Sequence, residues 1–434
     1  MAENAAKILA HEMYALCAEL FPICRSITGD GFRKSLSILA RHIEGLKVHE
    51  VASGTRCFDW QVPQEWNIKD AYIIAPNGEK ICNFKDSNLH VMGYSTPIDR
   101  LMTLTELQKN LHSLPDQPTA IPYLTSYYHE RWGFCISQEQ RDQLQEGNYH
   151  VFIDSELKEG SLTYGEIILP GRSDKEIFLS TYLCHPSMAN NELSGPVVTS
   201  YLAKWLAQLK NRKYSYRIII IPETIGSITY LSRHYKEMQK KVIAGFNITC
   251  IGDDKTYSYL SSRKGNTLAD QVILHVLKHK HPRFKSYSFL DKGSDERQYC
   301  SPGIDLPVCS VMRSKYGCYP EYHTSLDDMS FISPEGLFGG YDVIKTAVEC
   351  LEMNAVLSPS VMCEPQLGKR GLYPSISSKK TAAQVRNMMN FIAYCDGKLS
   401  ALEIAEIIGV PLWDLKDTLM KLVDKNVLDF PEND

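Results

Sequence analysis

The stretch 180–195, STYLCHPSMANNELSG, marks a point where a strand ends and a helix begins. The apolar run 176–183 predicts a buried strand, and a helix rich in Leu, Val and Ala follows the polar turn. In open α/β sheets, ligands bind where strands end and helices begin. His185 therefore lies where a metal ligand is expected. A strand-capping histidine followed by Asn190 or Asn191 as a helix cap explains the same residues equally well.

Outward from this stretch, strands alternate with helices, which predicts a mostly parallel sheet flanked by helices. The four isoleucines 218–221 are typical of a strand buried on both faces. The predicted strands are 148–154, 162–169, 175–183, 215–221, 242–249 and 305–312, and the predicted helices are 192–209, 226–239, 265–279 and 335–353.

The segments on either side of this pattern predict three domains. An α/β domain is expected over 1–64 and 136–355, interrupted by a small β-rich domain over 65–135. Asn77-Gly78 is a hairpin signal within the inserted domain. Its aromatic cluster 123–134 fits either the core of a small domain or the wall of a substrate groove. After a linker over 356–376, three helices and a short strand over 377–434 predict a winged helix, with a capping box at 400–403.

Composition excludes several classes of function. The 434 residues are 44% hydrophobic and 23% charged, with a net charge of −4, which argues against a nucleic-acid-coated surface. The 13 cysteines form no CxxC pairs, as expected for reduced thiols in a cytoplasmic protein. No signal peptide or membrane span is predicted. The expected recognition helix, within 412–426, has no net charge, which favours protein contact over DNA binding.

Three further stretches follow predicted strands or lie late in the chain, and each carries residues suited to hydrolytic chemistry. They are Pro222-Glu223-Thr224, the segment 291–297 and the segment 316–328, which contains His323. Each is weak evidence alone, because a Glu after a strand often begins a helix. Their order along an α/β chain adds weight, since such residues meet at one edge of the sheet.

This order resembles the zinc-dependent exopeptidase superfamily, specifically aminopeptidases with two catalytic metal ions. The matching segments are 190–195, 223–227, 293–295 and 322–325. The whole chain also resembles a bacterial aminopeptidase-like family with an inserted small domain and a C-terminal winged helix, often linked to polysaccharide biosynthesis. The segments that carry this closer resemblance are 24–29, 127–135 and 184–192.

The chain departs from the superfamily pattern at three carboxylate positions. Asn191 replaces the bridging Asp, Thr224 replaces the second Glu, and Thr249 replaces the Asp of an Asn-Leu-Asp motif. Amides and hydroxyls are poor substitutes for carboxylates on Zn²⁺, and two close cations need bridging negative charge. The resemblance therefore implies at most one zinc ion here.

The site implied by the resemblance has His185, Glu192 and His323 as zinc ligands, with Asp253 as an alternative to Glu192. Glu223 would be the general base. Arg297 or Arg263 would bind a substrate carboxylate, or would form ordinary surface ion pairs. The implied activity is that of an aminopeptidase or related amidohydrolase acting on a small peptide or an acylated amino compound.

The competing hypothesis is a catalytically inactive binding scaffold, because a fold alone does not confer activity. In either case, the winged helix is expected to pack against the α/β domain or a second subunit, which would make a homo-oligomer. Neither a membrane nor a nucleic acid is an expected partner.

Overall fold

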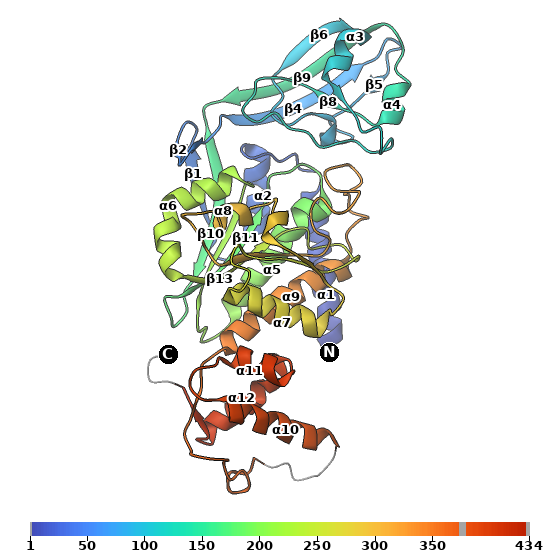
Figure 1. The fold of residues 1–434 in the computed structure, drawn as a ribbon. Coiled ribbons are helices and arrows are strands. Elements are labelled where there is room, and N and C mark those ends of the chain that lie inside the picture. Colours follow the sequence, from blue (N-terminus) through green and yellow to red (C-terminus); the bar gives the residue numbers. More distant parts are fainter. Residues whose placement is uncertain (1, 373–378, 431–434) are drawn as a thin grey trace. The chain divides into compact units, whose positions relative to one another are not determined.

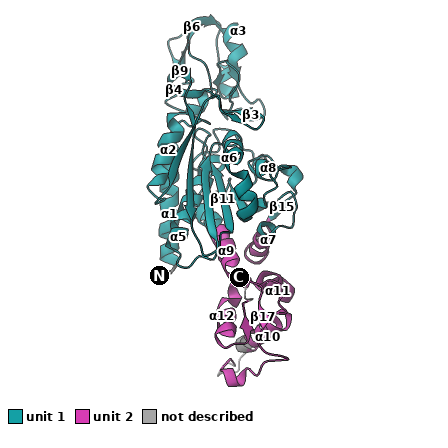
Figure 2. Ribbon diagram, turned by 90° about the vertical axis from the view of Figure 1, so that its left-hand side faces the viewer, with its two compact units in different colours: residues 1–270, 285–341 teal, residues 271–284, 342–434 magenta. Residues whose placement is uncertain are grey.

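The computed structural model describes residues 2–372 and 379–430. The chain divides into two compact units (Figure 2), one of residues 1–270 and 285–341 and the other of residues 271–284 and 342–434. Within the described ranges, no helix combines the length and the apolar character needed to cross a bilayer. Every cysteine is a free thiol, as the sequence predicts.

The first unit is built on an eight-stranded sheet in the order β1-β10-β12-β11-β13-β16-β14-β15. The four central strands β12, β11, β13 and β16 are parallel, whereas β10 is antiparallel to both of its neighbours and β14 is antiparallel to β16. Every residue of β11 and β12 is buried, which confirms the predicted strands buried on both faces. The bounds are β1 (Lys47–Ala52), β10 (Ser161–Leu169), β11 (Glu176–Tyr182), β12 (Ser215–Ile221), β13 (Val242–Ile248), β14 (Ser258–Leu260), β15 (Lys285–Tyr287) and β16 (Val308–Met312).

Helices cover both faces of this sheet (Figure 2). On one face α5 packs against β11 and against α1 and α2, and on the other α8 packs against β16 and α6. The predicted α/β fold is therefore confirmed. The helices of this unit are α1 (Ala2–Leu20), α2 (Asp30–Ala40), α5 (Ser194–Gln208), α6 (Ile225–Lys241) and α8 (Glu296–Tyr299), whereas α7 (Leu268–Lys280) and α9 (Pro334–Met353) are each divided between the two units.

The segment predicted to be an inserted domain, which keeps that name below, lies within the first unit and forms with β9 a second, antiparallel sheet in the order β5-β4-β9-β6 (Figure 1). Its strands are β4 (Glu65–Ile74), β5 (Lys80–Ile81), β6 (Ile98–Thr103) and β9 (Asn148–Lys158). β9 pairs with β4 and β6 rather than with the main sheet, so the domain extends past its predicted end at residue 135. The Asn77-Gly78 hairpin is confirmed, because β4 and β5 pair across it and Gly78 has φ +85°.

The remaining elements of the first unit are short. They are β2 (Arg56–Cys57), β3 (Trp60–Gln61), α3 (Leu104–Leu107), β7 (Leu111–His112), β8 (Phe134–Cys135) and α4 (Gln138–Asp142). Phe134 lies in the apolar core of the inserted domain with residues of β4, β6 and β9. Part of the aromatic cluster therefore has the structural role that the sequence allowed for.

The second unit contains α10 (Lys379–Tyr394), α11 (Ala401–Ile408) and α12 (Lys416–Asp424). The capping box is confirmed, since Ser400 and Glu403 exchange side-chain and backbone hydrogen bonds at the start of α11. β17 (Ser358–Pro359) pairs with β18 (Leu428–Asp429), so the winged-helix fold begins within the predicted linker rather than at residue 377. Residues 373–378 and 431–434 of the predicted linker and winged helix lie outside the described residues.

Candidate functional site

His185 lies in a buried loop that leaves the end of β11. Its Nδ1 is 2.6 Å from Glu192 Oε2, and its backbone carbonyl accepts a hydrogen bond of 3.0 Å from Arg25 Nε. Burial, followed by the nearby charge of Arg25, lowers the pKa of His185 to about 3. The imidazole is therefore neutral, which is the form that binds a metal.

Glu192 lies in a single π-helical turn, Ala189–Leu193, that precedes α5. Its side chain is fully buried, and burial raises its pKa to about 8, opposed by the positive charge of Arg25. Its Oε1 has no hydrogen-bond partner among the described residues. Glu192, predicted to be a metal ligand, thus lies against Nδ1 of His185, where it orients the ring.

His323 brings a second neutral imidazole beside the first. The two ring centroids are 5.2 Å apart, and burial, with His185 nearby, lowers the pKa of His323 to about 3. Its Nε2 is buried and has no partner within the described part of the chain. His323 also has φ +58°, an unfavourable backbone conformation for a residue with a Cβ, and Tyr322 stacks on its ring at 3.8 Å.

Glu223 lies on the other side of His185, with Oε2 3.7 Å from Nε2. Its side chain is 20% exposed whereas that of His185 is only 4% exposed, so Glu223 is the more accessible of the two. Burial and then the neighbouring Asp295 raise its pKa to about 8. A carboxylate with such a raised pKa, next to the His185 imidazole, suits proton transfer near neutral pH.

Thr224, the next residue, is bound by two residues at the start of α8. It has φ +64°, and its backbone N–H donates to Asp295 Oδ1 at 2.8 Å. Arg297 Nη2 donates to its hydroxyl at 2.6 Å. Arg297 therefore contacts the residue that follows Glu223, and its predicted role in substrate binding stays a prediction. Arg263 does not belong to this group, because it forms an exposed ion pair with Asp305.

Two of the three carboxylate positions that differ from the two-metal pattern, 191 and 249, belong to a neutral hydrogen-bond network. Thr249 Oγ1 donates to the Tyr182 hydroxyl at 2.6 Å, and that hydroxyl donates to Asn191 Oδ1 at 3.3 Å. Asp253, the alternative ligand, is instead bound by Ser314 through its backbone N–H and hydroxyl, each at 2.8 Å. Among the described residues, this network places no carboxylate at positions 191 and 249, where two close zinc ions would need bridging negative charge.

Two buried residues that the sequence reasoning did not assign support the site. Asp327 accepts hydrogen bonds from the backbone N–H groups of Asn190 and Asn191, at 2.6 and 2.9 Å, and so holds the π-helical turn. Arg25 binds the His185 carbonyl. The sequence contained weak signals for both, in the segment 316–328 and in the segment 24–29, but neither signal identified a contact.

The donor types found here suit zinc, and in this part of the described chain the residues whose ligand atoms lie within 4.8 Å of one another are Cys184, His185 and Glu192, a set that does not include His323. Two neutral imidazoles lie side by side, one with an unpartnered nitrogen, and a carboxylate lies close to the other. Histidine and carboxylate are ordinary zinc ligands. Glu192 Oε2 lies 2.6 Å from Nδ1 of His185, and Glu223 Oε2 lies 3.7 Å from Nε2 of the same ring.

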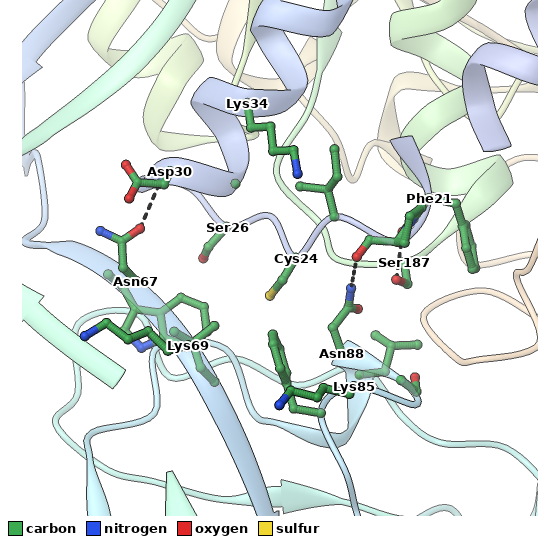
Figure 3. Close-up of a pocket in the computed structure, with 18 of the residues that line it drawn as sticks. Phe21, Cys24, Ser26, Asp30, Lys34, Asn67, Lys69, Lys85, Asn88 and Ser187 are labelled. Atoms are coloured by element: carbon green, nitrogen blue, oxygen red, sulfur yellow. Dashed lines mark hydrogen bonds between the residues drawn. The ribbon is translucent and has the colours of Figure 1, made fainter. Parts of the chain in front are cut away.

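Ser187, two residues after His185, is among the residues that line a cavity of about 950 Å³ (Figure 3). The α/β domain and the inserted domain both line it, and its walls include Cys24, Lys34, Trp66 and Ser187. Neither histidine is among its lining residues, although Ser187 follows His185 by two positions. In Figure 3 the hydrogen bond from Ser187 to the Phe21 carbonyl joins this loop to the end of α1.

Comparisons with known proteins agree with this fold. A family model described as "Domain of unknown function (DUF4910)" matches residues 14–354, and one described as "winged helix-turn-helix" matches residues 355–429. A Clostridium acetobutylicum protein named "Putative polysaccharide biosynthesis protein with aminopeptidase-like domain" is 46% identical over 407 residues, covering 93% of each chain.

Solved structures give the same result. A structure described as "putative peptidase" from Clostridium acetobutylicum has a TM-score of 0.93 and 43% identity, covering 99% of this chain and 98% of that one. The zinc aminopeptidase BSAP of Bacillus subtilis has a TM-score of 0.57 at 13% identity, covering 78% of this chain and 94% of that one, and it shows the fold alone. The chain belongs to the DUF4910 family and carries a C-terminal winged helix.

Proposed function

We propose that this DUF4910 protein is a zinc-dependent amide hydrolase of the aminopeptidase type, with one zinc ion bound by Nε2 of His185 and Nε2 of His323. The observation that carries the proposal is the pair of neutral, buried imidazoles with Glu223 beside them. When bound, zinc would polarise a water molecule and an amide carbonyl.

The chain's own residues would supply the remaining functions. Glu192 holds the Nδ1 side of His185, and the Arg25 charge favours the ionised form of Glu192. With the shared proton on Nδ1, Nε2 keeps its lone pair. Glu223 Oε2 would accept a proton from the attacking water and pass it to the leaving amine.

Arg297 is proposed to bind a carboxylate of the substrate. Its Nη2 holds Thr224, whereas its Nε is buried without a partner among the described residues. The substrate would be a small peptide or an acylated amino compound. The name of the Clostridium relative points toward polysaccharide biosynthesis, and an N-acylated amino sugar would connect that setting with amide hydrolysis.

The first experiment is metal analysis by mass spectrometry on untagged protein. We expect about one zinc per chain in the wild type and loss of zinc in His185→Ala and in His323→Ala. His11→Ala is the matched control, because His11 lies exposed on α1 and bonds only to the Lys7 carbonyl. Wild-type protein without zinc, even after zinc is supplied, would favour the binding scaffold.

The second experiment tests the base. Glu223→Gln should keep zinc and its melting temperature but lose at least a hundredfold in hydrolysis of amino-acid anilides or N-acylated amino sugars. A variant as active as the wild type would remove Glu223 from its role. A variant that loses zinc would make Glu223 a ligand instead.

A further inference from the structure

The inserted domain contributes a segment to the wall of the candidate site. Residues 117–127 run beside the loop that carries His323, where Tyr123 N–H donates to the His323 carbonyl at 2.9 Å. An antiparallel bridge joins Pro122 and Thr324. Ile121 and Ser325 add two hydrogen bonds, of 2.9 and 3.0 Å. This segment is therefore attached to the site by main-chain pairing.

Two tyrosines of this segment point into the site. The ring of Tyr123 contacts both imidazoles, with centroids 5.0 Å from His185 and 5.1 Å from His323. Its hydroxyl is 3.1 Å from the Tyr127 hydroxyl. The hydroxyl pair therefore lies beside the two imidazoles.

Tyr127 is held in an unfavourable conformation to reach this position. Its φ is +37°, in the left-handed region that residues with a Cβ rarely adopt. Tyr94 packs edge-on against its ring at 5.6 Å, and the Tyr94 hydroxyl bonds to Thr28 at 2.6 Å. Backbone strain of this kind persists where surrounding contacts enforce it, and it is concentrated at functional sites.

One of the two hydroxyl protons of the Tyr123–Tyr127 pair is free to donate a hydrogen bond to a ligand. Each phenol is neutral, because burial raises the pKa of both Tyr123 and Tyr127 well above the usual value. One hydroxyl donates to the other, so the accepting hydroxyl keeps its own O–H. That O–H has no acceptor among the described residues. A buried donor beside two imidazoles is suited to a ligand oxygen.

We propose that the Tyr123–Tyr127 pair donates a hydrogen bond to the carbonyl oxygen of the amide substrate, where negative charge develops during attack. The inference rests on the proposed function. No proton is transferred from the pair: it stabilises the developing oxyanion and returns unchanged. The inserted domain thereby supplies a catalytic group to the site of the α/β domain.

The test uses n-butylboronic acid, whose hydrated form is tetrahedral and anionic like the product of water attack. Binding to the zinc-loaded full-length protein is measured by calorimetry for wild type and for the Tyr123→Phe/Tyr127→Phe double variant. Either hydroxyl could hold the free proton, so the double variant is decisive. We expect it to bind roughly ten- to a hundredfold more weakly, while zinc content and melting temperature stay unchanged.

Tyr128→Phe is the matched control. Tyr128 is the next residue, and its hydroxyl bonds to the Gln61 carbonyl at 2.9 Å, so its variant should bind the probe as the wild type does. Equal affinity of the double variant and the wild type would overturn the inference alone. Loss of zinc from the double variant would also overturn it, by assigning the pair to holding the histidines. A wild type with neither zinc nor boronate binding would overturn the proposed function as well.

Discussion

At the scale of single residues, the site depends on a buried positive charge. The side chain of Arg25 is almost entirely inaccessible, at 1% exposure, yet it bonds to only two carbonyls, those of His185 and Leu20. Its remaining contribution is electrostatic, because it is the charge that opposes the rise in the pKa of Glu192. Arg25 thus binds the main chain of His185 and favours the ionised form of Glu192, which contacts the His185 ring.

We predict that Arg25→Met lowers the free energy of unfolding by roughly 2–4 kcal/mol, because two buried carbonyls lose their donor. It should also weaken zinc binding at least tenfold, as loss of an outer-shell partner usually does. Urea unfolding and competition with a coloured chelator measure these effects. Arg25→Lys keeps the charge and one donor, so it should recover part of the zinc affinity. Equal zinc affinity of the wild type, Arg25→Met and Arg25→Lys would contradict a role of Arg25 in zinc binding.

At the scale of secondary-structure elements, one arginine on a helix contacts side chains on three different strands. Arg33 on α2 forms an ion pair with Glu65 on β4, and it also contacts Glu50 on β1 and Ser161 on β10. Glu65 is nearly buried, at 7% side-chain exposure, whereas Arg33 retains 29%. Because β4 belongs to the inserted sheet, this network connects the inserted domain to the main sheet.

The hydrogen bond from Arg33 lowers the pKa of Glu65 from 4.5 to about 2. A carboxyl whose folded pKa is depressed stabilises the fold above its unfolded pKa and loses that contribution as pH falls through the folded value. We therefore predict an acid-sensitive contribution of about 1–2 kcal/mol, lost between about pH 4.5 and 2 and reduced by the exposure of Arg33. In Glu65→Gln, urea unfolding across this range should depend less steeply on pH. A slope equal to that of the wild type would contradict the assignment.

At the scale of the whole molecule, the surface of the winged helix bears on the kind of partner that we expect for it. α12 carries Lys416 and Lys421 against Asp417 and Asp424, which leaves it without net charge. Large apolar side chains are exposed on this unit, including Ile407 at 50% and Met420 at 59%. A helix without net charge binds phosphate groups weakly. Exposed apolar side chains favour contact with another protein surface.

Removal of residues 355–434 is therefore predicted to change the oligomeric state, measured by light scattering. We expect the full-length chain to be a homo-oligomer and the truncated chain to be a monomer. The cut precedes β17, so that no half of the β17–β18 pair is left exposed. An identical mass per particle for both proteins would contradict this prediction. Salt-sensitive binding of duplex DNA by the full-length chain would restore the nucleic-acid hypothesis.

The parts of the molecule predicted correctly are those that local sequence dictates. Four consecutive isoleucines at 218–221 can only suit a strand buried on both faces, and Asn77-Gly78 meets the backbone demand of a tight hairpin. The strand-end positions of His185 and Glu223 follow from the same patterns, because strand ends and helix starts recur at one edge of the sheet. His323 required the family resemblance, since nothing local distinguishes it from a loop histidine.

The sequence by itself thus determined the α/β fold, the hairpin, the winged helix and the residues at the strand ends. Tertiary structure alone decided which of those residues meet. A π-helical turn holds Glu192 against the Nδ1 side of His185, and each residue along a helix rotates the side chain by about 100°. Pairing between distant segments placed β9 in the small sheet and brought Tyr123 and Tyr127 to the histidines. Such contacts depend on three-dimensional proximity, which local residue patterns do not encode.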